Sequence, residues 1–103
     1  MAYILQVDFP YQGPWGDEMR VAMQALAQSI ATEDGLIWKI WTVNQEQKEA
    51  GGVYLFADQA NAQRYLTLHT ERLASFGIST VNAKIFEVHQ DLSALNHAPI
   101  HSS

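Results

Sequence analysis

The sequence predicts an α+β domain in which two helices cover one face of a four-stranded antiparallel sheet. Three observations indicate this class. Apolar and polar residues alternate over residues 3–9, as in a strand with one buried face. Two segments, about 18–32 and 59–76, repeat apolar residues at helical spacing. Between these segments, two aromatic and β-branched runs flank a polar connector, which is typical of a β-hairpin.

The length, charge and composition of the chain exclude several classes of protein. With 103 residues, 48% of them hydrophobic and 17% charged, the chain is expected to form one globular domain over residues 1–96, followed by a flexible tail, 97–103. A formal net charge of −5 disfavours binding to nucleic acid or to an anionic membrane. No apolar run spans a bilayer, and the N-terminus lacks the basic start of a signal peptide, so a cytoplasmic location is expected. The absence of cysteine excludes a disulfide, a thiolate nucleophile and a cysteine-based zinc site.

The first strand and first helix are separated by a loop that cannot pair regularly. Residues 10–16 contain two prolines and two glycines, which remove backbone donors and loosen the chain. Asp17 is expected to cap the helix that follows, and Glu18 in its first turn suits the helix dipole. The helix is expected to end before Gly35, which is free to adopt a left-handed conformation.

The central hairpin is apolar on both faces. Alternation over residues 35–42 places Leu36, Trp38 and Ile40 on one side of the strand. Lys39 and Trp41 then lie on the other side. After the connector, about residues 44–50, the second strand of the hairpin covers about residues 52–57. The pair of glycines at its start, 51–52, leaves room for a bulge or for a close approach of backbone or ligand. A strand that is apolar on both sides needs cover on both sides.

The remaining elements complete a β-α-β-β-α-β order. Asp58 is expected to cap the second helix, and a last strand covers about residues 80–88 before a final helical turn. This order is the ferredoxin-like arrangement, with both helices on one face of the sheet. The other face keeps apolar side chains, so we expect a homodimer packed sheet against sheet. One of Trp38 and Trp41 should then face a pocket and the other the dimer contact, and alternation does not decide which.

His69 is the leading candidate for chemistry. It lies on the apolar stripe of the second helix, about one turn from Tyr65 and from Arg72, and is expected to face the sheet. One interpretation is a proton acceptor in a pocket between helices and sheet. The other is a partly buried histidine that bonds to a hydroxyl or carbonyl group. Arg72 likewise either binds an anion such as a phenolate or faces solvent.

Aromatic residues could form the walls of that pocket. Trp38, Trp41 and Tyr54 would line a slot for a planar ligand, or else belong to the core and the dimer interface. Tyr11 and Trp15 in the loop between the first strand and first helix would form a lid, or a packed surface loop.

Other kinds of site have little support. The three remaining histidines, His89, His97 and His101, are scattered and lack carboxylates at ligand spacing, so no metal site is predicted. No phosphate-binding loop, dinucleotide fingerprint or nucleophile elbow is present.

Four blocks of sequence resemble one known family. They are Gly-Pro-Trp-Gly-Asp at residues 13–17, Gly-Leu-Ile-Trp-Lys-Ile-Trp-Thr at 35–42, Glu-Ala-Gly-Gly-Val-Tyr-Leu-Phe at 49–56 and Tyr-Leu-Thr-Leu-His-Thr-Glu-Arg-Leu at 65–73. Together with the order of elements, they are similar to the YdhR-type monooxygenase family over about residues 3–96. This resemblance implies the dimeric α+β-barrel superfamily, in which two ferredoxin-like protomers join their sheets.

The resemblance also implies a function. The superfamily includes monooxygenases that need no metal or flavin and oxidise phenolic polyketides to quinones, so O₂ and a small aromatic molecule are the expected partners. Catalytic candidates are His69, Tyr54, Tyr65 and Arg72, and substrate-binding candidates are Trp38, Trp41, Trp15, Tyr11 and Phe56. Two alternatives remain open: a binding protein without catalysis that holds an aromatic ligand, and an isomerase or ring-opening enzyme that does not use O₂.

Overall fold

The computed structural model describes residues 1–100, so His101 and the last two serines of the expected tail lie outside the described residues. Seven elements follow one another: β1 (Tyr3–Pro10), α1 (Gly16–Ile30), β2 (Leu36–Asn44), β3 (Glu49–Phe56), α2 (Gln59–Ser75), β4 (Asn82–Glu87) and α3 (Gln90–Leu95). The predicted β-α-β-β-α-β order is confirmed, and α3 forms where a final helical turn was expected.

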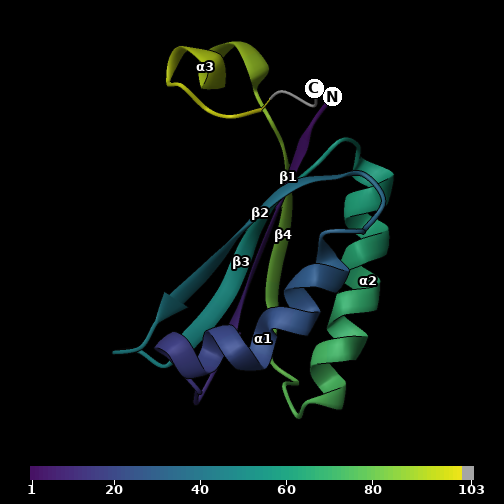
Figure 1. The fold of residues 1–103 in the computed structure, drawn as a ribbon. Coiled ribbons are helices and arrows are strands. Elements are labelled where there is room, and N and C mark those ends of the chain that lie inside the picture. Colours follow the sequence, from purple (N-terminus) through teal and green to yellow (C-terminus); the bar gives the residue numbers. More distant parts are fainter. Residues whose placement is uncertain (101–103) are drawn as a thin grey trace.

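The four strands form one antiparallel sheet in the order β2-β3-β1-β4. Helices α1 and α2 lie on one face of this sheet, whereas α3 lies beyond one end of it, near the N-terminus (Figure 1). The central strand β1 pairs with both β3 and β4, so Leu5 lies between Tyr54 and Ile85. This is the ferredoxin-like arrangement that the sequence predicts.

The core lies between the sheet and the helices. It is built from the residues of β1 and β3 that face the helices and from the inner residues of α2. Its fully buried side chains include Leu5, Val7, Tyr54, Phe56 and Tyr65. Burial of these side chains contributes most of the driving force for folding.

The expectation that side chains alternate strictly between the two faces of β2 is wrong at the start of the strand. The pairing register between β2 and β3 shifts between Leu36 and Trp38, which is a β-bulge. Leu36 therefore pairs with Phe56 and packs against the core on the helix side, instead of sharing a face with Trp38. Trp38 lies opposite Leu55 on the other face of the sheet.

The two helix caps differ from each other. Asp58 caps α2 as predicted, since its carboxylate accepts a hydrogen bond from the backbone N–H of Asn61 at 2.8 Å. The expectation that Asp17 caps α1 is wrong, because the helix begins at Gly16 and its N-cap is Trp15, which makes no side-chain cap bond. Asp17 instead lies in the first turn, where its charge suits the helix dipole.

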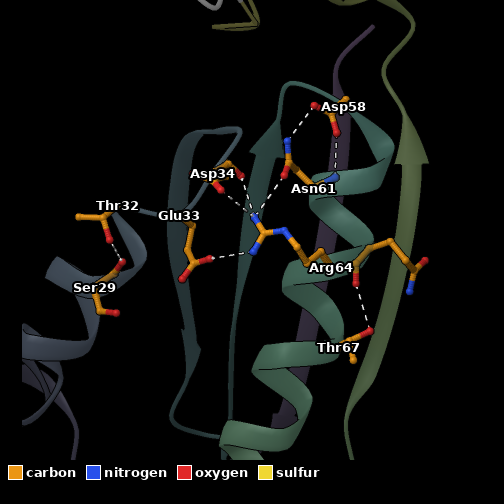
Figure 2. Close-up of polar contacts among 9 residues, drawn as sticks. Ser29, Thr32, Glu33, Asp34, Asp58, Asn61, Arg64 and Thr67 are labelled. Carbon is orange, nitrogen blue, oxygen red and sulfur yellow. Dashed lines mark hydrogen bonds and ion pairs between the residues drawn. The ribbon is translucent and has the colours of Figure 1, made fainter.

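A polar network joins the start of α2 to the connection between α1 and β2 (Figure 2). The guanidinium of Arg64 lies 3.8 Å from the carboxylate of Glu33 and 3.9 Å from that of Asp34. It also donates to the side chain of Asn61 at 3.2 Å, and Asn61 in turn donates to Asp58. The network fixes the end of the sheet from which β2 begins.

The second face of the sheet carries exposed apolar side chains. Ile40 is 55% exposed and Phe86 is 47% exposed. On the same face, the indole N–H of Trp38 donates to the backbone carbonyl of Pro99 at 2.7 Å, which holds the chain after α3 against the sheet. Within residues 1–100, no helix is long and apolar enough to cross a lipid bilayer.

Candidate functional site

A cavity of about 670 Å³ lies between the sheet and the helices. Its floor is formed by the strands, chiefly Lys39, Trp41 and Tyr54. The inner side of α1 and the loop after β1 cover it, while α2 and the loop that follows it, 76–80, form one wall. The volume is in the range of small-molecule sites, and most of the lining is apolar.

Lys39 is the central polar group of the floor. Its ammonium nitrogen lies 3.6 Å from the ring centre of Trp41 and 4.6 Å from that of Tyr54, so it makes cation–π contacts with both rings. Gly52 makes this position possible, because a Cβ atom there would come within 2.7 Å of Cε of Lys39. At the neighbouring Gly51 a Cβ atom would overlap the backbone carbonyl of Val7, so that glycine permits the close approach of β1.

The wall from α2 carries His69, which is 4% exposed and lines the cavity. Its ring stacks on that of Tyr65 with centroids 5.1 Å apart and meets the ring of Tyr54 edge-on at 6.3 Å. The hydroxyl oxygens of Tyr54 and Tyr65 are 3.3 Å apart and share a hydrogen bond. These three side chains, from one strand and one helix, therefore form one buried polar cluster.

The surroundings of this cluster and of Lys39 shift the pKa values of their side chains. Burial, with help from the charges of Lys39 and Arg72, lowers the pKa of His69 to about 4, so its imidazole is neutral at physiological pH. Burial and the positive charge of Arg72 lower the pKa of Lys39 to about 7. The pKa values of Tyr54 and Tyr65 are raised, mainly by burial, so both phenols remain protonated and can donate hydrogen bonds.

Two buried side-chain nitrogens on α2 have no hydrogen-bond partner within residues 1–100: Nδ1 of His69 and Nη1 of Arg72. A buried polar atom without a partner costs free energy, so such atoms are concentrated at sites where a ligand or water completes the bonding. Arg72 does not line the cavity itself, but its charge acts on Lys39, Tyr54, Tyr65 and His69.

The loop after β1 closes one side. Tyr11 lines the cavity, is buried, and donates a hydrogen bond from its hydroxyl to the carbonyl of Pro14 at 2.9 Å. The ring of Trp15 meets that of Tyr11 edge-on at 5.0 Å and lies outside the lining. Trp15 thus supports Tyr11 from behind.

Three of the five predicted binding residues do not line the cavity: Trp15, which packs behind Tyr11, together with Trp38 and Phe56. Trp38 lies on the opposite face of the sheet, where it bonds to Pro99, while Trp41 faces the cavity. Phe56 is fully buried in the core, next to Tyr54 and Tyr65, without lining the cavity. The structure therefore brings together His69, Tyr54, Tyr65, Trp41 and Tyr11, and the charge of Arg72 acts on His69 and on both tyrosines of the cluster.

Lys39 was not among the predicted site residues. A signal for it exists in the sequence, since it is the only charged residue in the apolar run 36–43 and shares its face with Trp41. The lining from α1, chiefly Met19, Met23 and Leu26, has no such signal, because an apolar stripe normally packs directly on the sheet. Among residues 1–100, no cluster of three His, Cys, Asp or Glu side chains could hold a metal ion.

Comparison with known proteins bears on the family and the fold. A family model described as "Putative mono-oxygenase ydhR" matches residues 4–99. A search of curated proteins gave no match.

Two solved structures are similar in fold. One is a mutant of SnoaB, a cofactor-independent oxygenase from Streptomyces nogalater, at 16% identity over 88% of this chain and 96% of that chain, with a TM-score of 0.63. The other is described as a putative antibiotic biosynthesis monooxygenase from Deinococcus radiodurans, at 12% identity over 87% of this chain and 94% of that chain, with a TM-score of 0.57. At these identities they establish the shared fold.

Proposed function

The chain belongs to the YdhR mono-oxygenase family, and we propose that it is a cofactor-independent monooxygenase acting on small phenolic or polycyclic aromatic compounds. The observation that carries this proposal is the cavity of about 670 Å³ whose aromatic floor adjoins a buried neutral imidazole. Trp41 and Tyr54 offer ring faces and edges to a planar ligand. SnoaB, a cofactor-independent oxygenase with the same fold, supports the same reaction class.

The chemistry begins with removal of a proton from the substrate. His69 is neutral, so one of its ring nitrogens can accept a hydrogen bond and then the proton from an acidic C–H or O–H group of the substrate. The resulting anion gives one electron to O₂, and the two radicals combine to form a C–O bond. The peroxide anion takes back the proton held by His69, and the hydroperoxide loses water to leave a carbonyl, so that a CH₂ group and O₂ yield C=O and H₂O.

Tyr54 and the loop at Tyr11 would assist these reaction steps. The hydroxyl of Tyr54 remains protonated and can donate a hydrogen bond to the developing oxyanion. The loop at Tyr11 covers one side of the cavity and limits the access of water, which would otherwise stabilise and protonate the anion.

The homodimer expected from the sequence belongs to the same proposal. The second sheet face, with Ile40 and Phe86 exposed, would be covered by a second copy of the chain. Ile40→Glu should convert a dimer to a monomer in analytical ultracentrifugation, whereas Val21→Glu, on the exposed side of α1, should not. A wild-type chain that sediments as a monomer would contradict the dimer.

Oxygen uptake tests the activity. With an anthrone or a naphthol as substrate, the wild-type protein should consume O₂ faster than buffer, and His69→Asn should lower the rate by roughly 100-fold or more, the usual contribution of a positioned base. His97→Asn is the matched control, because His97 is exposed, lies outside the cavity, and has a positive φ that asparagine tolerates. No uptake above buffer would sink the oxygenase proposal. Tight binding without turnover would instead indicate a binding protein, and turnover under nitrogen an isomerase or ring-opening enzyme.

A further inference from the structure

Lys39 is a cation in the cavity without a carboxylate. Of the residues that the structure describes, it is the only charged one that lines the cavity, although the chain as a whole has a formal net charge of −5. The ion pairs within residues 1–100 are made by Arg20 and Arg64, and none involves Lys39. The ring faces of Trp41 and Tyr54 attract its ammonium group but leave its charge in place.

The groups around Lys39 add no negative charge. From α2, His69 is neutral, Tyr65 is protonated, and Arg72 brings a second positive charge and a buried Nη1 atom without a partner. From β3, Tyr54 is protonated. The residues of α1 that line the cavity are Met19, Ala22, Met23 and Leu26, and Tyr11 comes from the loop before it. Glu33, whose charge reaches Tyr65, is paired with Arg64.

An unpaired cation held among aromatic rings calls for an anionic ligand with an apolar body. We propose that the cavity binds an aromatic oxyanion, a phenolate or a carboxylate on a ring system, and that Lys39 is its counter-ion. The inference deepens the proposed function and rests on it for the identity of the ligand as substrate. It adds the charge of the ligand and the residue that binds it.

The ionisation of Lys39 supports this assignment. A pKa of about 7 reflects burial and repulsion from Arg72, and a bound oxyanion would remove part of that penalty and raise the pKa again. Between pH 6 and 9, His69 stays neutral, and Tyr54 and Tyr65 stay protonated. Lys39 is therefore the group at the cavity that titrates in this range.

Isothermal titration calorimetry with matched probes tests the inference. At pH 6, 2-naphthoate should bind the wild-type protein at least tenfold more tightly than the neutral 2-naphthamide. This preference should decrease as the pH rises through the pKa of Lys39, because the ammonium form is lost. Lys39→Met, which keeps an unbranched side chain one atom shorter and removes the charge, should abolish both the preference and its pH dependence. Lys39→Arg should restore at least part of the preference. Lys48→Met, in the exposed turn between β2 and β3, is the control and should behave as wild type.

The two sources of oxyanion are separated by 2-naphthol. If the site binds phenolates, the naphtholate absorption band should appear on binding at pH 7 to the wild-type protein and be absent with Lys39→Met. A response to naphthoate alone would identify a carboxylate as the oxyanion. Equal binding of naphthoate and naphthamide by the wild type would overturn the inference, as would a preference that survives in Lys39→Met. The comparison of probes in the wild type does not depend on any variant folding.

Failure of the inference is distinct from failure of the proposed function. Charge-selective binding without any O₂ consumption would leave the oxyanion site in place and remove the oxygenase. Oxygen uptake whose rate and substrate affinity are unaffected by Lys39→Met would support the oxygenase and remove the oxyanion site at Lys39.

Discussion

Helices α1 and α2 occupy corresponding places in the two halves of the fold, yet they pack differently. Helix α2 buries Ala62, Tyr65, His69 and Leu73 against the sheet, whereas α1 buries only Ile30. Both helices have an apolar stripe at the same spacing. The stripe thus decides which side of a helix faces the sheet, and not how closely it approaches. Because α1 approaches less closely, its inner side covers a cavity instead of filling a core.

The largest expected effect compares one leucine on each helix. Leu73→Ala on α2 removes a side chain that is 4% exposed and should lower the free energy of unfolding by about 3 kcal/mol. Leu26→Ala on α1 removes a side chain that is only half-buried and should cost less than half as much, although both leucines line the cavity. Urea denaturation of the two variants measures the difference. Equal losses would mean that α1 packs as closely as α2 in solution.

The second prediction concerns pH and the buried histidine of α2. The pKa of His69 falls from an ordinary value near 6.5 to about 4 on folding, so between these values the unfolded chain binds more protons than the folded one. Its contribution to stability is therefore fully present above pH 6.5 and is lost as the pH falls toward 4. The free energy of unfolding of wild type relative to His69→Gln should fall over this range by on the order of 2 kcal/mol, as measured by denaturation at each pH. A difference that does not change with pH would contradict the shift.

A smaller effect is expected from the hydroxyl pair that joins α2 to β3. Tyr65→Phe removes one partner of the bond between Tyr54 and Tyr65, in a fully buried place, and should cost about 1 kcal/mol. Tyr54→Phe should cost a similar amount. The double variant should cost less than the sum of the two, since the same bond is lost in both. Simple additivity in a double-mutant cycle would show that the hydroxyls do not interact.

The substitution expected to change stability least, but to weaken ligand binding clearly, lies on α1. Met23→Phe places a larger ring in the cavity and should change the free energy of unfolding by less than about 0.5 kcal/mol, because open space receives it. Binding of 2-naphthoate should weaken at least tenfold in calorimetry. Val21→Phe, at a position of the same helix that is 65% exposed, should leave binding unchanged. Unchanged binding in Met23→Phe would place the ligand elsewhere.

Much of the fold could be predicted because local patterns agree with one another. The order of the elements, the cap at Asp58 and the hairpin follow from periodicity and from residue types with strong local preferences. The predictions of local structure that are wrong concern positions where long-range packing overrides the local sequence pattern. Alternation fails at Leu36 because a bulge turns its side chain toward the helices. The cap at Asp17 fails because the helix begins earlier.

The candidate site was only partly predictable. His69, Tyr54 and Tyr65 were identified from their faces and residue types, and the structure places them in contact. Lys39 was overlooked because a lysine in a strand is usually a surface residue whose charge faces water. Trp38 and Phe56 were grouped with the site because an aromatic residue has the same pattern in a core, at an interface or in a pocket.

The sequence by itself determined the class of the fold, the side of each helix that faces the sheet and the family, because these depend on periodicity and on local motifs. Tertiary structure alone decided that Trp41, and not Trp38, faces the cavity. It also decided that α1 covers a cavity and that, among residues 1–100, Lys39 lies there without a carboxylate to pair with. These features depend on the distance between a helix and a sheet and on the register of two strands. Both are set by the packing of residues far apart in the chain.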